Sequence, residues 1–216
     1  MNRNAAALVL ASLAAVAPAA PSFARLDAEE TACRAIPEHL HSAATAGDAQ
    51  AQAVLGVLLI EGRCGASEST RRDGMDWLAR ASAQGHADAA ALLGDLLMAG
   101  PSTRKAEALT HYRRAAEGGH VTAQHRLGIL LVAAGNRDAR EEGLYWLGAA
   151  SSGGDGMAAV AVGLLHARGL HGVPHDACLA AVWYEAGRLI GAPVPVAKLE
   201  AELGTDMTHL CNGRAP

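Results

Sequence analysis

The stretch His111-Tyr-Arg-Arg-Ala-Ala-Glu-Gly-Gly119 decides the fold, because variants of it recur along the chain. The three other full copies are Trp77-Leu-Ala-Arg-Ala-Ser-Ala-Gln-Gly85, Tyr145-Trp-Leu-Gly-Ala-Ala-Ser-Ser-Gly153 and Trp183-Tyr-Glu-Ala-Gly-Arg-Leu-Ile-Gly191. The glycines that close the copies are spaced by 34, 34 and 38 residues. Such a period predicts a stack of similar helical units.

The aromatic residues follow the same period. Apart from Phe23, every ring lies in the first two positions of a copy, at Trp77, Tyr112, Tyr145, Trp146, Trp183 and Tyr184. Because the remaining apolar residues are mostly alanine, we expect these rings to fill the space between neighbouring helices.

A second signature lies upstream of each ring-bearing stretch. It is a Leu-Gly or Val-Gly pair with alanine four residues earlier, as Ala89 precedes Leu93-Gly94. In the second unit this pattern predicts a helix over about 87–98, stopped by Gly100-Pro101, and then a second helix capped by Ser102 or Thr103. Each unit is therefore expected to be a pair of helices whose apolar faces are covered by stacking.

These observations predict an all-α fold, a right-handed α/α solenoid of about four helix-turn-helix repeats with capping half-units. A fainter copy, His39-Leu-His-Ser-Ala-Ala-Thr-Ala-Gly47, lacks rings and predicts a lone N-terminal helix with the least packing volume. The expected segments are a signal peptide over 1–24, capping helices over 25–48, repeats over about 49–85, 86–119, 120–153 and 154–191 (together 49–192), and a capping segment over 193–216.

The first 24 residues are expected to direct export. Arg3 is followed by an Ala-rich apolar run over 5–17 that is short for a membrane span, and Ser22 and Ala24 are small residues before Arg25. An uncleaved anchor is the weaker alternative. The formal net charge of −4 argues against nucleic-acid binding, which depends on basic patches.

The order Ala-x-x-x-Leu-Gly, then Gly, then Trp-Tyr-x-x-Ala-Ala-x-x-Gly resembles the Sel-one-like repeat family, which is related to tetratricopeptide repeats. The resemblance covers about residues 37–191 and is carried by several spaced positions that recur together. Two departures are Gly187, which replaces the first alanine of the last copy, and His166, which stands where Leu59, Leu97 and Leu131 stand elsewhere. The resemblance implies a protein-binding scaffold, because periplasmic members assemble the envelope or sequester the periplasmic domain of a sensor kinase.

Four cysteines, an even count, fit an oxidising compartment. In the repeat frame, Cys33 and Cys64 fall near neighbouring helix ends, and Cys178 and Cys211 have the same relation at the other end of the array. We predict the disulfides Cys33–Cys64 and Cys178–Cys211. Free buried thiols are the alternative, although secreted relatives in the family staple repeats with disulfides.

Ser102-Thr-Arg-Lys105 matches the Ser-x-x-Lys string of serine β-lactamases, and some secreted family members have been linked to penicillin binding. The supporting Ser-Asp-Asn and Lys-Thr-Gly motifs are missing, and the one other lysine is Lys198. We therefore interpret Ser102 as a helix cap and predict no enzymatic activity and no cofactor.

The histidines give a second set of candidates. His166, His171 and His175 bracket the loop of the last unit and are interpreted as loop residues in preference to a metal site. His86 and His120 occupy positions where a helix starts. His111, in a ring position, is interpreted as packing.

A binding surface is expected beside the Leu-Gly signatures, on the first helices of the units, which line the concave groove in solenoids of this type. The polar residues of that row are Asp95, His125 and Arg126. Arg113, Arg114, Arg137 and Arg140 are interpreted as a solvated face. The sequence therefore favours an exported, periplasmic or secreted, adaptor with a protein or peptide partner in the groove. The alternatives are a cell-wall or β-lactam-directed activity and a secreted effector that engages host proteins.

Overall fold

The computed structural model of the 216-residue chain describes residues 36–62, 67–100 and 104–194, and every regular element within them is helical. The elements are α2 (Glu38–Thr45), α3 (Ala49–Ile60), α4 (Glu68–Ala83), α5 (Ala87–Met98), α6 (Lys105–Glu117), α7 (Val121–Ala133), α8 (Arg137–Ser152), α9 (Gly156–Arg168), the short 3₁₀ helix η2 (Leu170–Gly172) and α10 (Ala177–Leu189). The helix expected over 87–98 is α5 and is confirmed.

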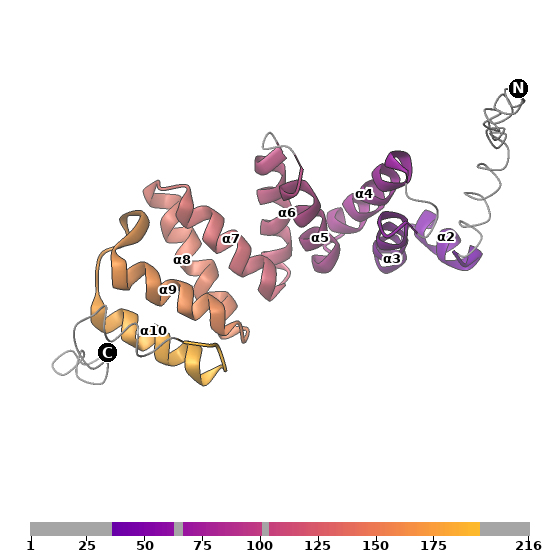
Figure 1. The fold of residues 1–216 in the computed structure, drawn as a ribbon. Coiled ribbons are helices and arrows are strands. Elements are labelled where there is room, and N and C mark those ends of the chain that lie inside the picture. The colour runs from indigo at the N-terminus through magenta and orange to yellow at the C-terminus, as the bar shows by residue number, and fades with distance from the viewer. Residues whose placement is uncertain (1–35, 63–66, 101–103, 195–216) are drawn as a thin grey trace, which may run out of the picture.

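Helices follow one another as pairs that stack in chain order. The pairs are α3 with α4, α5 with α6, α7 with α8 and α9 with α10, and each pair also packs against the next. Figure 1 shows the pairs laid side by side from the N-terminal to the C-terminal end in one elongated array. The predicted all-α solenoid of helix-turn-helix units is confirmed, with α2 as a single helix before the first pair.

The first helix of each pair begins directly after a glycine in the left-handed region. These terminal glycines, with φ between 81° and 98°, are Gly47, Gly85, Gly119 and Gly154. The next residue caps the helix through its side chain, and these caps are Asp48, His86, His120 and Asp155. In His86 the Nδ1 atom accepts a hydrogen bond from the amide of Ala89 at 3.2 Å, which confirms the interpretation of these histidines as helix starts.

One copy of the repeat is shifted by one residue from the sequence alignment. Gly153, the C-cap of α8, has a negative φ of −78°, whereas Gly154 has φ of 98° and precedes the cap Asp155. Counted back from Gly154, the equivalents of Trp77 and Leu78 are Trp146 and Leu147, so the expected pairing of Tyr145 with Trp77 is wrong. Because two glycines are adjacent, the sequence alone does not show whether the third copy ends at Gly153 or at Gly154.

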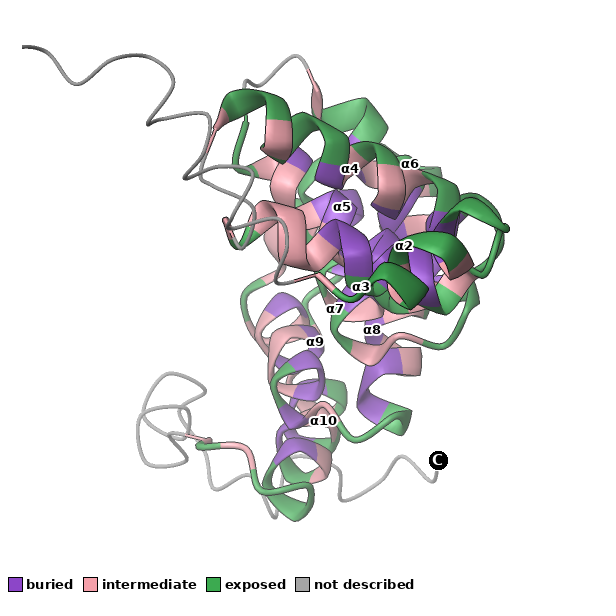
Figure 2. Cartoon of the chain, turned by 90° about the vertical axis from the view of Figure 1, so that its right-hand side faces the viewer, coloured by how far each residue is buried: buried purple, intermediate pink, exposed green. Residues whose placement is uncertain are grey.

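With this register, two positions on the second helix of each unit have distinct roles. The inner position, seven residues before the terminal glycine, is buried in all four units, at Leu78, Tyr112, Leu147 and Tyr184. The outer position, one residue earlier, holds Trp77, His111, Trp146 and Trp183, of which only His111 is buried. Figure 2 shows the buried residues along the faces where helices meet.

The expectation that all six rings fill the space between helices holds fully for the two buried tyrosines, in part for the three tryptophans, which pack against the core, and fails for Tyr145. Tyr112 and Tyr184 are buried, the three tryptophans are half-buried, and Tyr145 is 66% exposed. Counted back from Gly154, Tyr145 lies one residue before the outer position, outside both ring positions of the repeat.

In every pair, the inner residue lies where the two helices approach each other closely at a glycine. A Cβ on Gly56 would lie 2.8 Å from the carbonyl oxygen of Gly74 and from the side chain of Leu78. The pair α7 and α8 repeats this arrangement, whereas in α5 and α6 a Cβ on Gly94 would meet the ring of Tyr112 at 2.8 Å. The Leu-Gly and Val-Gly signatures thus mark the places where a helix touches the inner residue of its partner.

Candidate functional site

The three predicted binding residues lie on the first helices of the second and third units, and the structure brings two of them together. Asp95 on α5 accepts hydrogen bonds from the Tyr112 hydroxyl at 2.6 Å and from the Arg126 guanidinium on α7. Burial raises the pKa of the Tyr112 hydroxyl. This chain of contacts joins two neighbouring units and fixes the orientation of half-exposed charged groups.

The third residue, His125, is bonded elsewhere. Its Nδ1 lies 2.7 Å from Oδ2 of Asp155, whose Oδ1 caps α9 by accepting from the amides of Met157 and Ala158. Asp95, His125 and Arg126 therefore all connect successive first helices, and their role in binding a partner stays a prediction.

The structure does not assemble the candidate histidines into a metal site. His166 Nδ1 lies 3.1 Å from the carbonyl oxygen of Pro174, and His171 has a left-handed φ of 52° in η2. Within residues 36–62, 67–100 and 104–194 no group of three or more His, Cys, Asp or Glu side chains is arranged to hold a metal ion.

Several predicted features fall partly or wholly outside the described residues. They include Ser102, the signal peptide 1–24, and Cys33, Cys64 and Cys211. Cys178 lies in the first turn of α10, and the two disulfide pairings stay predictions. In the structure α6 begins at Lys105, and the residue at its cap position, Arg104, makes no capping hydrogen bond through its side chain. No helix of the described part of the chain is both long and apolar enough to cross a membrane.

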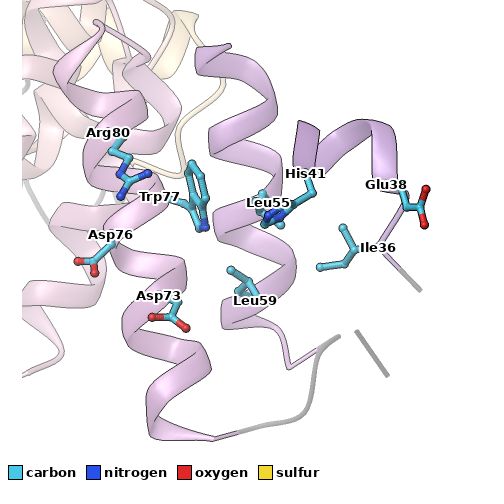
Figure 3. A pocket seen from close by; sticks show the side chains of 9 residues that line it. All are labelled: Ile36, Glu38, His41, Leu55, Leu59, Asp73, Asp76, Trp77 and Arg80. Carbon is cyan, nitrogen blue, oxygen red and sulfur yellow. The ribbon is translucent and has the colours of Figure 1, made fainter. Parts of the chain in front are cut away.

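A pocket of about 510 Å³ lies at the N-terminal end of the stack, between α2, α3 and α4 (Figure 3). Its apolar lining comes from Ile36, just before α2, from Leu55 and Leu59 on α3, and from Trp77 on α4. The indole of Trp77 contacts the ring of His41 edge to face, with centroids 6.2 Å apart, and lies 4.5 Å from the guanidinium of Arg80.

Three carboxylates stand around this pocket. Asp73 and Asp76 are on α4, and Glu38 is the first residue of α2 on the opposite side (Figure 3). All three are exposed, and none of them forms an ion pair with another described residue. The pocket therefore combines an apolar wall with an excess of negative charge at its edge.

Among the described residues, the helix beside the pocket on its N-terminal side, α2, is short. It has 8 residues, whereas α4 and α8 have 16. Sequence reasoning missed the pocket itself, although the ringless copy at His39 had indicated an end with little packing volume.

We call the line along which the second helices of successive units face each other a seam, and count α2 as the first of these helices. The other seams are filled by side chains. Ser82 Oγ of α4 lies 3.2 Å from Nδ1 of the buried His111 on α6. Between α8 and α10, the ring of Trp183 lies where a Cβ on Gly148 would be 3.7 Å away. Between α6 and α8, Arg113 forms a two-pronged ion pair with Glu142, at 2.9 and 3.1 Å.

The Arg113–Glu142 contact corrects the interpretation of Arg113 as part of a solvated face. The Arg113 guanidinium lowers the pKa of Glu142, which also accepts a hydrogen bond from Trp146 Nε1 at 3.3 Å. Both side chains stay about two-fifths exposed, so the pair contributes little to stability and mainly fixes geometry.

Comparison with solved structures identifies proteins of the same fold. A Sel1 repeat protein from Oxalobacter formigenes is 25% identical, with a TM-score of 0.61 over 85% of this chain and 83% of that one. The protein c5321, described as a protective antigen of uropathogenic Escherichia coli with an SLR fold, is 23% identical, with a TM-score of 0.59 over 80% of this chain. The chain spans 42% of the length of c5321.

No sequence-family model matches the chain, and no curated protein matches it. The structural likeness nevertheless confirms the resemblance seen in the sequence. The chain is an SLR-like helical repeat protein. Its fold supports a role as a repeat scaffold for protein–protein interaction.

Proposed function

We propose that the protein is an exported scaffold or adaptor that binds a protein partner along its first helices, in the bacterial periplasm or outside the cell, and regulates envelope signalling or assembly. The observation that carries the proposal is the polar row of Asp95, Arg126 and His125, held in place by contacts between units. Side chains that are already ordered lose little conformational entropy when a partner binds.

Export is supported by the sequence of the first 24 residues. Its test is the mass of the protein recovered from a periplasmic fraction, for which we expect an N-terminus at Arg25. A protein that keeps residues 1–24 would contradict this part of the proposal.

Partner binding is tested by crosslinking in cells, purification of the tagged protein from the envelope and identification of what it carries. Arg126→Ala should reduce the recovered partner strongly. Arg104→Ala, which removes a part-exposed arginine at the cap position just before α6, should leave recovery unchanged. Thermal unfolding of both variants separates lost binding from lost folding.

Two results would contradict the proposal. One is the absence of any partner that depends on Arg126 or Asp95. The other is turnover of a reporter β-lactam that is lost on Ser102→Ala, because a scaffold needs no such catalysis.

A further inference from the structure

The seam between α6 and α8 shows how an arginine fits between two second helices of this chain. Arg113, six residues before Gly119, reaches across to Glu142, twelve residues before Gly154, through two hydrogen bonds. Trp146, at the outer position, donates to the same carboxylate. A planar guanidinium held in this two-pronged way is a strong and specific contact for a carboxylate.

The seam between α2 and α4 keeps the tryptophan and a carboxylate at the equivalent positions, with aspartate for glutamate and histidine for arginine. Counted from Gly47 and Gly85, the three equivalent positions hold His41, Asp73 and Trp77. His41 contacts the indole of Trp77, and no described guanidinium pairs with Asp73. A carboxylate and an indole thus occupy the positions of Glu142 and Trp146, and a histidine stands at the position of the arginine.

The space at this seam suits the rest of an arginine-containing segment. Leu55 and Leu59 line the pocket beside Trp77, and Ile36 lies on its other side (Figure 3). An arginine carries an apolar stem as well as a charged head, and the pocket of about 510 Å³ has room for that stem and part of a neighbouring apolar side chain.

The charge around the pocket selects a cation. Three carboxylates, Glu38, Asp73 and Asp76, line it against one guanidinium, that of Arg80. Arg80 already lies 4.5 Å from the Trp77 ring, so the ring accepts a cation on its face. An anionic or neutral segment would leave these carboxylates without a partner.

We propose that the pocket between α2, α3 and α4 binds an arginine side chain of a protein partner, flanked by an apolar residue, which pairs with Asp73 as Arg113 pairs with Glu142. The proposal rests on the proposed function in taking the partner to be a protein. It adds a second contact surface at the N-terminal end of the stack, separate from the row of Asp95, His125 and Arg126.

The test uses the full-length protein and two synthetic probes, acetyl-Leu-Arg-Leu-amide and the same peptide with citrulline in place of arginine. Citrulline has nearly the same shape as arginine and no charge. The readout is the indole N–H signal of Trp77 in a ¹H–¹⁵N NMR titration, assigned with Trp77→Phe. We expect the arginine peptide to shift this signal and to bind roughly tenfold more tightly than the citrulline peptide.

Two charge-matched variants locate the contact. Asp73→Asn should weaken the arginine peptide roughly fivefold to tenfold, and Asp138→Asn, an exposed carboxylate on α8, should leave binding unchanged. His41→Arg places the chain's own guanidinium where Arg113 stands in the other seam. It should abolish peptide binding while the circular dichroism spectrum stays that of the native protein.

Other outcomes overturn the proposal. Equal binding of both peptides, or a Trp77 signal that ignores Asp73→Asn, would show that the pocket does not select a guanidinium. If the peptide binds the Arg34→Gln variant and does not bind the native protein, the native occupant of the pocket is the chain's own segment before Ile36. If the Trp77 signal shifts when only the protein concentration is raised, the occupant of the pocket is a second copy of this chain. A partner captured through Arg126 but indifferent to Asp73→Asn would leave the proposed function intact and remove this inference.

Discussion

The α6/α8 seam and the α2/α4 seam share a tryptophan and a carboxylate at equivalent positions and form different surfaces. In the first, Arg113, Glu142 and Trp146 close the line between two full-length helices. In the second, His41, Asp73 and Trp77 surround an open pocket beside a helix of 8 residues. The difference shows that one position in a repeat serves structure inside the array and becomes accessible at its end.

The largest expected effect on stability comes from the buried inner residues, at which the two regions should behave alike. Leu147 and Leu78 occupy equivalent inner positions and are fully buried. Leu147→Ala and Leu78→Ala should each reduce the free energy of unfolding by about 3–5 kcal/mol in urea denaturation, because each leaves a cavity between close helices. A much smaller loss for Leu78→Ala would mean that the whole first unit is loose, and that the pocket is only its visible part.

The next largest effect on stability should differ between the α6/α8 seam and the α2/α4 seam. Trp146 packs against the main core and bonds Glu142, whereas Trp77 lines the pocket. Trp146→Ala should cost about 2–3 kcal/mol and Trp77→Ala about 1–2 kcal/mol, both less than a fully buried ring. Thermal melts of the two variants measure the difference, and equal costs would contradict the contrast between a closed seam and an open one.

The α4/α6 seam, which lies between the two seams compared above, should make the stability of the fold depend on pH. Burial lowers the pKa of His111, and the nearby Arg114 lowers it further. The folded state therefore favours the neutral imidazole, and its stabilising contribution is present above about pH 6.5 and is lost as the pH falls below that value. Urea midpoints between pH 7.5 and 5 should fall more steeply for the native protein than for His111→Gln. Parallel curves would show that His111 is not held neutral.

The smallest effect is the ion pair itself. A double-mutant cycle with Arg113→Ala and Glu142→Ala should give a coupling energy of about 0.2–1 kcal/mol that weakens with added salt, because both groups are part-exposed. A coupling above about 2 kcal/mol would mean that the seam depends on this pair for stability. In that case the missing arginine beside Asp73 would be a structural weakness of the first unit.

The periodic sequence allowed much of the fold to be predicted. Helix α5, the role of His86 and His120 at helix starts, and the stacking of helix pairs all followed from spacing, because helical periodicity and capping depend on residues within one or two turns. The register of the third unit did not follow, since Gly153 and Gly154 are the same residue type and only the structure distinguishes them by φ and by the contact of Gly153 with Val121.

The candidate site was less accessible to sequence reasoning. Asp95 and Arg126 were singled out as exposed binding residues, and the structure shows them bonded to each other across two units. Arg113 was taken as solvated, although it pairs with a residue 29 positions later. Contacts of this kind join residues that no local pattern relates.

The sequence by itself determined that this chain is an array of helix pairs, the bounds of α5 and the residues at which α5 and α7 begin. Only the tertiary structure decided which ring faces the core, which charges are paired between units, and that the Trp77 pocket is open. The reason is physical: helix formation and capping are local, whereas burial and ion pairing depend on what the neighbouring unit supplies, and at the first seam that neighbour is a short helix with a histidine where an arginine stands elsewhere.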